Sequence, residues 1–510
     1  MAYLIGLDVG TSGTKTVLFD ENGTALASVT EEYPLHTPNP GWTEQDPNDW
    51  WRAAQNTLKA VLEQSGVDAG EVKGIGLSGQ MHGSVFLDEG RNVVRNALLW
   101  NDSRTAAECE EINAALGEQR LLEMASNPAL TGFTAPKAVW LKNREPENFQ
   151  KTRTLFLPKD YVRFCLTGEI AMEVSDAAGT LLFDVKSRSW CHEILDALGI
   201  PREWMPPVHE STDVCGRISA ETAKRTGLKE GTPVVGGGAD NACGATGTGV
   251  VRPGRVLASL GTSGVVLAPS TQHEVDPQAR AHTFCHSVPN MWYLMGVILS
   301  AGMSLSWYRD TIADSERASA EQSGRDPYDV LTELASTAPI GSEGLLFLPY
   351  LTGERTPHKD PHARGGFIGL TIRHERKHLV RAVLEGITFA MRDSMEIMRE
   401  LGVPIEEVRA TGGGAKSPFW KQLQADIYGC EIATINSDQG PAFGAALMAG
   451  VGAGVYNSLP EACDQIIKVV ERTAPDETRK QEYDDYYQAF RGSYPGIRET
   501  CHTLSGLVSA

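Results

Sequence analysis

The tetrapeptide Gly-Thr-Ser-Gly occurs twice in this chain, at Gly10–Gly13 and at Gly261–Gly264. Each copy follows a short apolar run and precedes a β-branched run, so each is expected to be a turn between two strands. Glycines let backbone N–H groups converge on an anion, and the Thr and Ser hydroxyls add short donors. A single copy is also typical of a plain hairpin connection. Two copies, one in each half, predict a duplicated fold that holds one polyphosphate between its halves.

The chain has 510 residues, which is too long for one hydrophobic core. We expect two domains, residues 1–250 and 251–510, a division that leaves room for the final helix to pack back on the first domain. Strands and helices alternate along the sequence, which favours an α/β architecture. No strand–GxxxxGK(S/T)–helix arrangement occurs, which excludes a P-loop. The segment after Gly13 has the β-formers of a strand, which excludes a dinucleotide-binding fingerprint.

The overall composition indicates which kinds of partner and which cellular compartment to expect. The formal net charge of −19 argues against nucleic acid or an anionic membrane as the main partner. Nine cysteines without a Cys-x-x-Cys pair indicate reduced thiols. The sequence contains no signal segment and no apolar run of membrane-spanning length. We therefore expect a cytoplasmic protein.

Local signals predict several elements that surround the candidate site. Asp46 and Pro47 are typical of a helix start, and Gly66 of its end. Ser417 and Pro418 predict a second helix start, directly after a glycine-rich turn. A long helix is expected over 379–399, and the polar segment 310–329 is expected to be surface.

Two aspartates are candidates for phosphoryl-transfer chemistry. Asp8 lies in an otherwise apolar strand, where burial without a partner is costly, so it is a candidate to hold Mg²⁺ directly or through water. Its other interpretation is a turn aspartate that binds its own backbone. Asp240 follows Gly236–Gly238 and could accept a proton from a substrate hydroxyl. The alternative is a flexible glycine turn capped by an aspartate.

Met81 and His82 follow an expected strand. A neutral imidazole and a thioether suit an uncharged polyol, although a lone histidine is more often structural.

The whole chain resembles the FGGY family of carbohydrate kinases. The resemblance depends on several sequence blocks that follow one another in the order typical of the family. The blocks are Gly6–Lys15, Gly76–Gly83, Leu99–Arg104, Gly132–Leu141, Gly236–Gly249, Leu260–Gly264, Leu348–Pro357 and Gly412–Trp420. The resemblance implies two ribonuclease-H-like (actin-like ATPase) domains around a central ATP and sugar cleft, with ATP and Mg²⁺ as cofactors.

By motif match, the resemblance implies that Asp240 is the proton acceptor and that Asp8 serves catalysis and the metal. It implies sugar contacts from Met81, His82, Trp100, Asn101, Asp102 and Asn241. It implies ATP contacts from Thr11, Ser12, Gly13, Lys15, Gly261, Thr262, Ser263, Gly413, Gly414, Ala415 and Ser417. It also allows a homodimer.

Three functions stay open at this point. The segments Gln80–Gly83 and Trp100–Asp102 most resemble family members that convert the ketopentose D-xylulose to its 5-phosphate. A kinase for another polyol, such as ribulose, gluconate or glycerol, would share the same fold and base. An actin-like ATPase switch would use the same paired loops but would not explain a sugar pocket.

Overall fold

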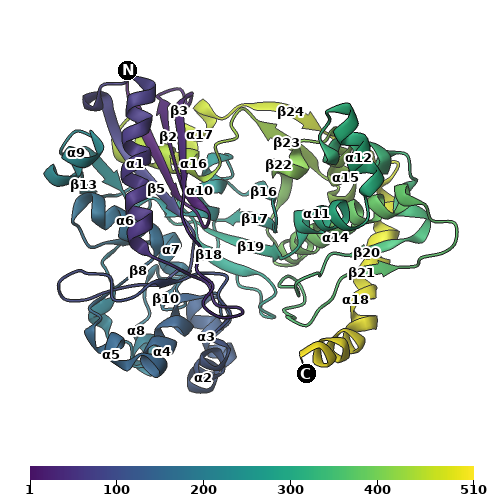
Figure 1. Cartoon of the computed structure of the whole chain (residues 1–510), viewed down its shortest axis with the longest axis horizontal. Coiled ribbons are helices and arrows are strands. Elements are labelled where there is room, and N and C mark those ends of the chain that lie inside the picture. Colours follow the sequence, from purple (N-terminus) through teal and green to yellow (C-terminus); the bar gives the residue numbers. More distant parts are fainter. Residues whose placement is uncertain (510) are drawn as a thin grey trace.

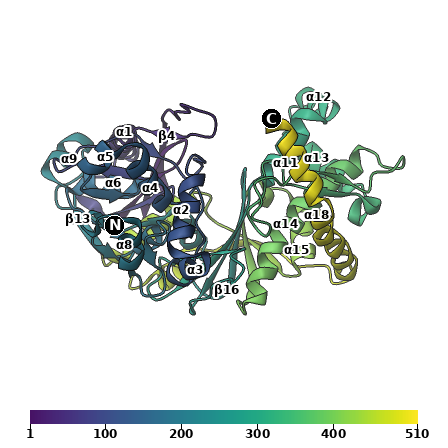
Figure 2. The same cartoon turned by 90° about the horizontal axis from the view of Figure 1, so that it is seen from below.

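A computed structural model describes residues 1–509. Two seven-stranded sheets organise the chain, one formed before residue 240 and the other after residue 253. Figures 1 and 2 show them in two lobes, the first carrying the purple and blue segments and the second most of the green and yellow ones.

The first sheet has the order β13-β14-β5-β1-β2-β3, and β15 also pairs with β5. Strand β1 is antiparallel to β2 and parallel to β5. Asn22 and Gly23 lie in the turn of the hairpin between β2 and β3, and the φ of Gly23 is +80°. The strands are β1 (Tyr3–Val9), β2 (Gly13–Asp20), β3 (Ala25–Glu32), β5 (Val72–Gly79), β13 (Val214–Arg217), β14 (Pro233–Val235) and β15 (Gly238–Ala239).

The second sheet repeats this arrangement, with the order β18-β19-β17-β16-β22-β23-β24. Strand β16 is antiparallel to β17 and parallel to β22, as β1 is to β2 and β5. Each Gly-Thr-Ser-Gly copy forms the turn between the first two strands of its sheet. The predicted α/β class with two ribonuclease-H-like domains is therefore confirmed. The strands are β16 (Gly254–Leu260), β17 (Gly264–Ser270), β18 (His282–Cys285), β19 (Trp292–Ile298), β22 (Ile405–Gly412), β23 (Glu431–Ile435) and β24 (Val469–Thr473).

The predicted helix starts are present. Asp46 caps α1 (Pro47–Ser65) by accepting from the Asn48 N–H, and Gly66 ends it at φ +67°. Ser417 caps α15 (Pro418–Tyr428) by accepting from the Trp420 N–H. The long helix α14 (Arg376–Glu400) begins three residues earlier than expected, because a capping box with Glu375 and His378 fixes its start.

A helix from the second half of the chain completes the first lobe. Helix α16 (Pro441–Gly452) packs on β1, β5 and α10 (Asp240–Gly247). A Cβ at Gly6 would lie 1.8 Å from the Ala442 oxygen, and one at Gly76 2.0 Å from the Ala445 oxygen. Glycine is required at both positions because the helix backbone rests directly on the sheet.

The final helix α18 (Lys480–Ser509) does not pack back on the first lobe. It packs on α14, α15 and β20 (Leu346–Leu348) of the second lobe. The Tyr487 hydroxyl donates to Asp393 on α14 at 2.6 Å. The expectation for the final helix is therefore corrected, since α16 is the helix that crosses.

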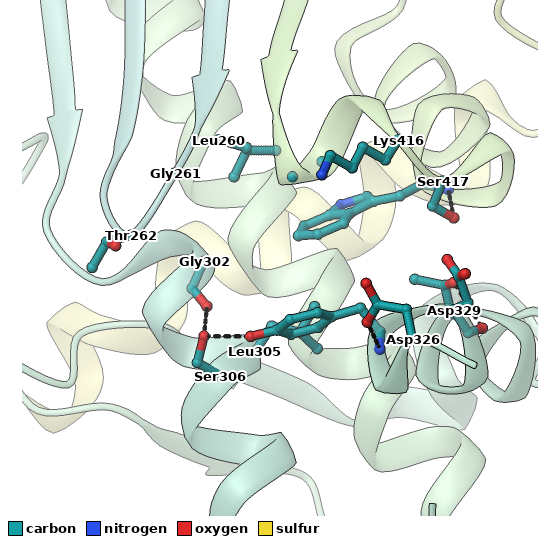
Figure 3. A pocket seen from close by; sticks show the side chains of 15 residues that line it. Leu260, Gly261, Thr262, Gly302, Leu305, Ser306, Asp326, Asp329, Lys416 and Ser417 are labelled. Atoms are coloured by element: carbon teal, nitrogen blue, oxygen red, sulfur yellow. Dashed lines mark hydrogen bonds between the residues drawn. The ribbon is translucent and has the colours of Figure 1, made fainter. Parts of the chain in front are cut away.

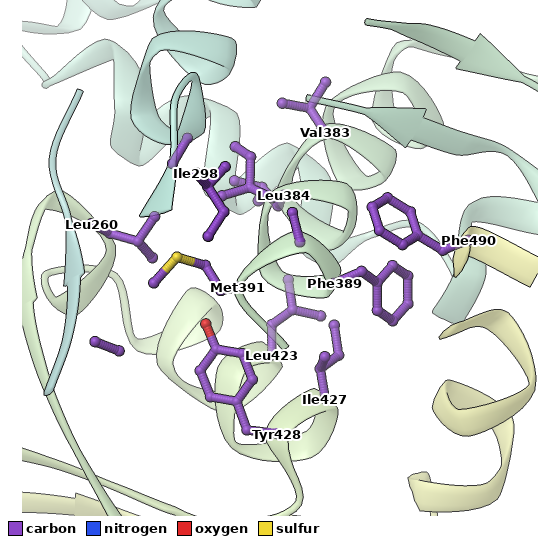
Figure 4. Packing of buried hydrophobic residues seen from close by; sticks show 14 of the residues in the cluster. Leu260, Ile298, Val383, Leu384, Phe389, Met391, Leu423, Ile427, Tyr428 and Phe490 are labelled. Carbon is purple, nitrogen blue, oxygen red and sulfur yellow. The ribbon is translucent and has the colours of Figure 1, made fainter. Parts of the chain in front are cut away.

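The largest hydrophobic cluster lies around α14 in the second lobe. Figure 4 shows Phe389 and Met391 of α14 with Leu423 of α15 and Ile298 of β19 in this cluster. A second cluster joins residues of both lobes, including Met81 and Phe133 with Phe284 and Met295. The lobes therefore share buried apolar contacts beneath the candidate site.

The other elements complete the two lobes and their connections. The short strands are β4 (Glu44–Gln45), β6 (Val85–Leu87), β7 (Ala97–Leu98), β8 (Thr154–Phe156), β9 (Met172–Glu173), β10 (Phe183–Asp184), β11 (Ser189–Trp190), β12 (Val208–His209) and β21 (Gly366–Ile368). The helices are α2 (Ala106–Leu116), α3 (Glu118–Ala125), α4 (Thr134–Arg144), α5 (Pro146–Lys151), α6 (Pro158–Thr167), α7 (Val174–Ala178), α8 (His192–Leu198), α9 (Ala220–Thr226), α11 (Ala301–Thr311), α12 (Asp314–Ser323), α13 (Pro327–Ser336) and α17 (Leu459–Ile466). Within residues 1–509, no helix has both the length and the apolar character to cross a membrane.

Candidate active site

Asp8 and Asp240 lie on the two sides of strand β5. Asp8 is paired with Ser78 of β5 on one side, and Gly238 of β15 is paired with Ser78 on the other. Asp240 begins helix α10 directly after β15. The sheet register therefore brings together two carboxylates that are 232 residues apart in the sequence (240 − 8).

The environment of Asp240 raises the pKa of its carboxyl group. Burial and the nearby negative charge of Asp8 raise its pKa to about 7. Two donors from Asn241 limit the rise, since its N–H and its Nδ2 lie 2.7 and 2.8 Å from Asp240 Oδ1. A carboxylate with a pKa near the working pH is suited to act as a general base.

Asp8 is the second acid of the pair. Burial raises its pKa, and the positive charge of Lys15, its partner on β2, opposes that rise. Its Oδ1 is buried and has no hydrogen-bond partner among the described residues. Within the same residues, no group of three or more His, Cys, Asp or Glu side chains could hold a metal ion. An orphaned carboxylate oxygen fits Mg²⁺, which prefers one or two carboxylates and keeps several waters.

His82 is held neutral with a defined tautomer. Burial lowers its pKa to about 3, and its Nδ1 lies 2.6 Å from the Gly179 carbonyl oxygen. A carbonyl only accepts, so Nδ1 carries the proton and Nε2 is left as an acceptor. The His82 carbonyl accepts from Lys137 Nζ at 2.9 Å and Thr134 Oγ1 at 3.1 Å, which fixes the backbone at φ +65°.

Met81 connects His82 to the acidic pair. Its sulfur lies 3.7 Å from Asn241 Nδ2, and Asn241 in turn binds Asp240. The Phe133 ring packs 4.5 Å from the imidazole of His82. The structure therefore places Met81, His82, Asn241 and Asp240 in one continuous set of contacts.

Trp100 contacts the first Gly-Thr-Ser-Gly loop, and that loop contacts Gln80, the residue before Met81. Its Nε1 donates to Thr11 Oγ1 at 2.9 Å, and Thr11 Oγ1 donates to Gln80 Oε1 at 3.3 Å. The side chain is 38% exposed, so part of the ring is free for a ligand.

Asn101 and Asp102 both accept hydrogen bonds from Thr43. Asn101 Oδ1 accepts from Thr43 Oγ1 at 2.8 Å. Asp102 is 1% exposed, and its oxygens accept from the guanidinium of Arg104 at 2.7–3.0 Å and from the Thr43 N–H at 2.7 Å. The structure therefore gives Asp102 a buried ion pair with Arg104, and its predicted sugar contact stays a prediction.

Hydrogen bonds within the turn and from Gln45 hold the first phosphate-loop candidate, Gly10–Gly13, in place. The Gly10 N–H donates to the Gly13 carbonyl at 3.0 Å and closes the turn. Gln45 Nε2 donates to the Thr11 carbonyl at 2.7 Å. Ser12 is exposed at the tip of the turn.

The second loop borders a cavity of about 310 Å³ in the second lobe. Its Gly261 and Thr262 carbonyls accept from the N–H groups of Gly302 and Met303, each at 3.0 Å, which fixes the loop on α11. Figure 3 shows Lys416 and Ser417 on one side of the cavity, facing Ser306 and Asp326 on the other. The lining residues are Leu260, Gly261, Thr262, Gly302, Leu305, Ser306, Asp326, Tyr328, Asp329, Thr332, Gly413, Gly414, Lys416, Ser417 and Trp420.

Most of the residues predicted for ATP on the second half line this cavity. Two of them do not. Ala415 packs against the hydrophobic cluster of the second lobe, and the Ser263 carbonyl closes the loop by accepting from the Gly261 N–H at 3.0 Å. At Gly414 a Cβ would lie 2.4 Å from Leu260 Cδ1, so a larger residue there would require the Leu260 side chain to move.

The opposite wall of the cavity was missed by the sequence analysis. Asp326, Tyr328 and Asp329 fall in the segment expected to be surface, yet they line the cavity. Tyr328 is held in place because its hydroxyl lies 2.8 Å from Ser306 Oγ. Asp326 and Pro327 carry a recognisable helix-start signal, but the signal does not reveal what the helix faces.

A buried charged cluster beneath Asp240 was also missed. The Ala239 N–H donates to Ser175 Oγ at 2.9 Å, and Ser175 Oγ donates to Glu173 at 2.8 Å. Glu173 lies 3.3 Å from Lys159 Nζ, which also pairs with Asp176 at 2.9 Å. These contacts fix the backbone directly before Asp240.

Comparisons with known proteins agree with this arrangement. The model of the N-terminal domain of the FGGY family of carbohydrate kinases matches residues 3–247, and that of the C-terminal domain matches residues 256–453. The xylulose kinase of Bacillus subtilis (strain 168) is 43% identical over 98% of this chain and 98% of its own length. The xylulose kinase of Escherichia coli (strain K12) is 40% identical over 96% of this chain and 98% of its own length. The ligand-bound crystal structure of xylulose kinase from Lactobacillus acidophilus has a TM-score of 0.92 at 30% identity, over 99% of this chain and 100% of its own.

Proposed function

Since this chain belongs to the FGGY family of carbohydrate kinases, we propose that it transfers the γ-phosphoryl group of ATP to D-xylulose, giving D-xylulose 5-phosphate and ADP. The observation that carries the reaction is the buried Asp240, whose pKa is about 7, in contact through Asn241 with the neutral Met81–His82 wall. The relatives named xylulose kinases, matched over nearly their full length, support the choice of sugar.

Asp240 is the general base of the proposed step. The sugar O5 attacks the γ-phosphorus in line while Asp240 takes the proton from that hydroxyl. The bond from the phosphorus to the β,γ-bridging oxygen breaks, and ADP leaves with its electrons. His82 Nε2 accepts from a sugar hydroxyl, and the Met81 side chain forms an apolar wall.

The two Gly-Thr-Ser-Gly loops bind the nucleotide phosphates in this proposal. Their N–H and hydroxyl donors, together with Lys15, stabilise the charge on the transferring group. The cavity between Tyr328 and Trp420 has aromatic and apolar walls that suit a nucleoside. Mg²⁺, when bound, neutralises phosphate charge, and the orphaned Oδ1 of Asp8 is the oxygen that would hold it.

We further propose that the enzyme works in the cytoplasm on small molecules, with residues 1–250 and 251–510 as its two domains. The distribution of the two sheets supports this division, apart from the crossing of α16 to the first lobe.

A sugar acid, gluconate, is a second candidate substrate with support of its own. The gluconokinase of Bacillus subtilis (strain 168) is 30% identical over 94% of this chain and 93% of its own length. The test is coupled ADP release with Mg·ATP across D-xylulose, D-ribulose, L-ribulose, gluconate and glycerol. Selective turnover of D-xylulose supports the proposal. A better response to another acceptor overturns the substrate, and ADP release that ignores every acceptor favours an ATPase switch.

A further inference from the structure

Arg355 comes from the second lobe, in the loop that follows β20, and its backbone is fastened on both sides. Glu354 Oε1 accepts from the N–H groups of Leu299 at 3.0 Å and Arg355 at 2.8 Å. The Thr356 N–H donates to the Val297 carbonyl at 3.1 Å, and the Val297 N–H donates to Thr356 Oγ1 at 3.1 Å. Both neighbours of Arg355 are thus tied to the end of β19, which fixes where its side chain begins.

The guanidinium of Arg355 reaches the first lobe. A Cβ built on Gly132 would lie 3.9 Å from Arg355 Nη2 and 2.6 Å from the Trp100 carbonyl oxygen. The Gly132 carbonyl accepts from Lys137 Nζ at 2.7 Å, and Lys137 also binds the His82 carbonyl. Arg355 Nη2 therefore lies at the wall that carries Trp100 and His82. Its positive charge also contributes to the lowered pKa of His82.

Within residues 1–509, no side chain or carbonyl accepts a hydrogen bond from this guanidinium, and no carboxylate pairs with it. Burial lowers the pKa of Arg355, although the charge of Glu354 opposes the shift. Arg104, in the same region, is by contrast fully engaged by Asp102 and Glu44. The Arg355 side chain is half-buried, so its donors stay accessible and can meet oxygens that arrive with a ligand.

We propose that Arg355 is a specificity-determining contact for the sugar, and that its guanidinium donates to the oxygens at the carbonyl end of the ketose. This assignment rests on the proposed function. Asp240 receives the reacting hydroxyl in the proposed step. Contacts through Asn241 and Met81 lead from Asp240 to His82, the residue whose pKa the charge of Arg355 affects. A carbonyl oxygen only accepts, which matches a side chain that only donates. Because Arg355 belongs to the second lobe, the bound sugar bridges both lobes.

The test compares binding of D-xylulose and xylitol, which carries a hydroxyl in place of the carbonyl, by calorimetry without ATP. Arg355→Met is expected to weaken D-xylulose binding about 100-fold and xylitol binding less than about tenfold. Arg355→Lys keeps the charge but loses the planar fork, so its affinity for D-xylulose should lie between those of the wild type and Arg355→Met. Arg373→Met, at an exposed arginine of the same lobe, is the matched control and should change neither affinity.

Thermal unfolding separates this role from a structural one. Removing a half-buried guanidinium that no described residue engages should leave the melting temperature of the sugar-free protein unchanged or higher. A lower melting temperature for Arg355→Met, or equal losses on both ligands, overturns the assignment. Wild-type protein that neither binds nor phosphorylates D-xylulose overturns the proposed function and this assignment together. An active wild type whose selectivity survives in Arg355→Met overturns the assignment alone.

Discussion

Asp8 and Asp240 flank strand β5, and the charge of the first contributes to raising the pKa of the second to about 7. Each aspartate lies close to the carboxyl end of a strand, and α/β folds commonly bind ligands outside these strand ends. The pairing has a chemical consequence. A carboxylate kept basic by burial and by a like charge can take a proton that an ordinary exposed aspartate would leave on the hydroxyl.

Replacing the proposed base should abolish turnover without loss of binding. Asp240→Asn keeps the shape of the side chain but cannot accept the proton, so kcat is expected to fall by about 10²-fold or more. Coupled ADP release measures kcat, and calorimetry measures ATP and sugar affinity. Asp314→Asn, at an exposed position of α12, is the control. Near-normal turnover in Asp240→Asn would show that another group is the base.

Activity should depend on pH through Asp240. The base form is needed, so kcat/KM should fall about tenfold per unit as the pH drops below about 7. His82, with a pKa of about 3, stays neutral and should add no limb between pH 5.5 and 8.5. In Asp8→Asn the like charge is gone, so the limb of the residual activity should move to lower pH. A flat profile for the wild type would contradict this account.

Filling the cavity of the second lobe should weaken the binding of ATP without affecting the binding of the sugar. A Cβ at Gly413 would meet only the Leu260 oxygen, at 3.8 Å, so Val fits the backbone there and projects into the cavity. We expect Gly413→Val to raise the KM for ATP about tenfold or more and to leave sugar affinity unchanged. Gly366→Val, where no heavy atom lies within 4 Å, is the matched control. An unchanged KM for ATP would place the nucleotide elsewhere.

The contact of α16 with the first sheet should control stability. A Cβ at Gly76 would lie 2.0 Å from the Ala445 oxygen, and a helix backbone cannot move aside as a flexible side chain can. Gly76→Ala is therefore expected to lower the free energy of unfolding by at least about 2 kcal/mol. Gly492→Ala, on the open face of α18, should leave it unchanged or higher. Urea unfolding measures both, and equal stability of the two variants would contradict the packing described.

Local sequence signals predicted the elements whose causes are local. Asp46 and Ser417 cap helices where expected, because a short side chain before a proline satisfies the first free N–H groups of a helix. The repeated tetrapeptide marked the equivalent turns of two sheets. Its glycines, hydroxyls and flanking strands all lie within a dozen residues of each other.

Contacts between distant segments could not be predicted in the same way. Nothing near Asp326 or Tyr328 in the sequence reveals that α13 faces the second loop across a cavity. The burial of Asp102 in an ion pair with Arg104 also appears only in the folded chain. Arg355 falls in the block Leu348–Pro357, but its position near Gly132 and Trp100 of the other lobe appears only in the folded chain.

The sequence by itself determined the duplicated α/β fold, the two phosphate-loop candidates and the identity of the acidic residues, since periodicity, turn chemistry and motif order are written over short stretches of chain. Only the tertiary structure decided that α16 rather than the final helix completes the first lobe, and that Asp8 acts on Asp240. The physical reason is that sheet register, burial and charge proximity arise when remote segments pack together, and the pKa of a carboxylate depends on neighbours that only the folded chain supplies.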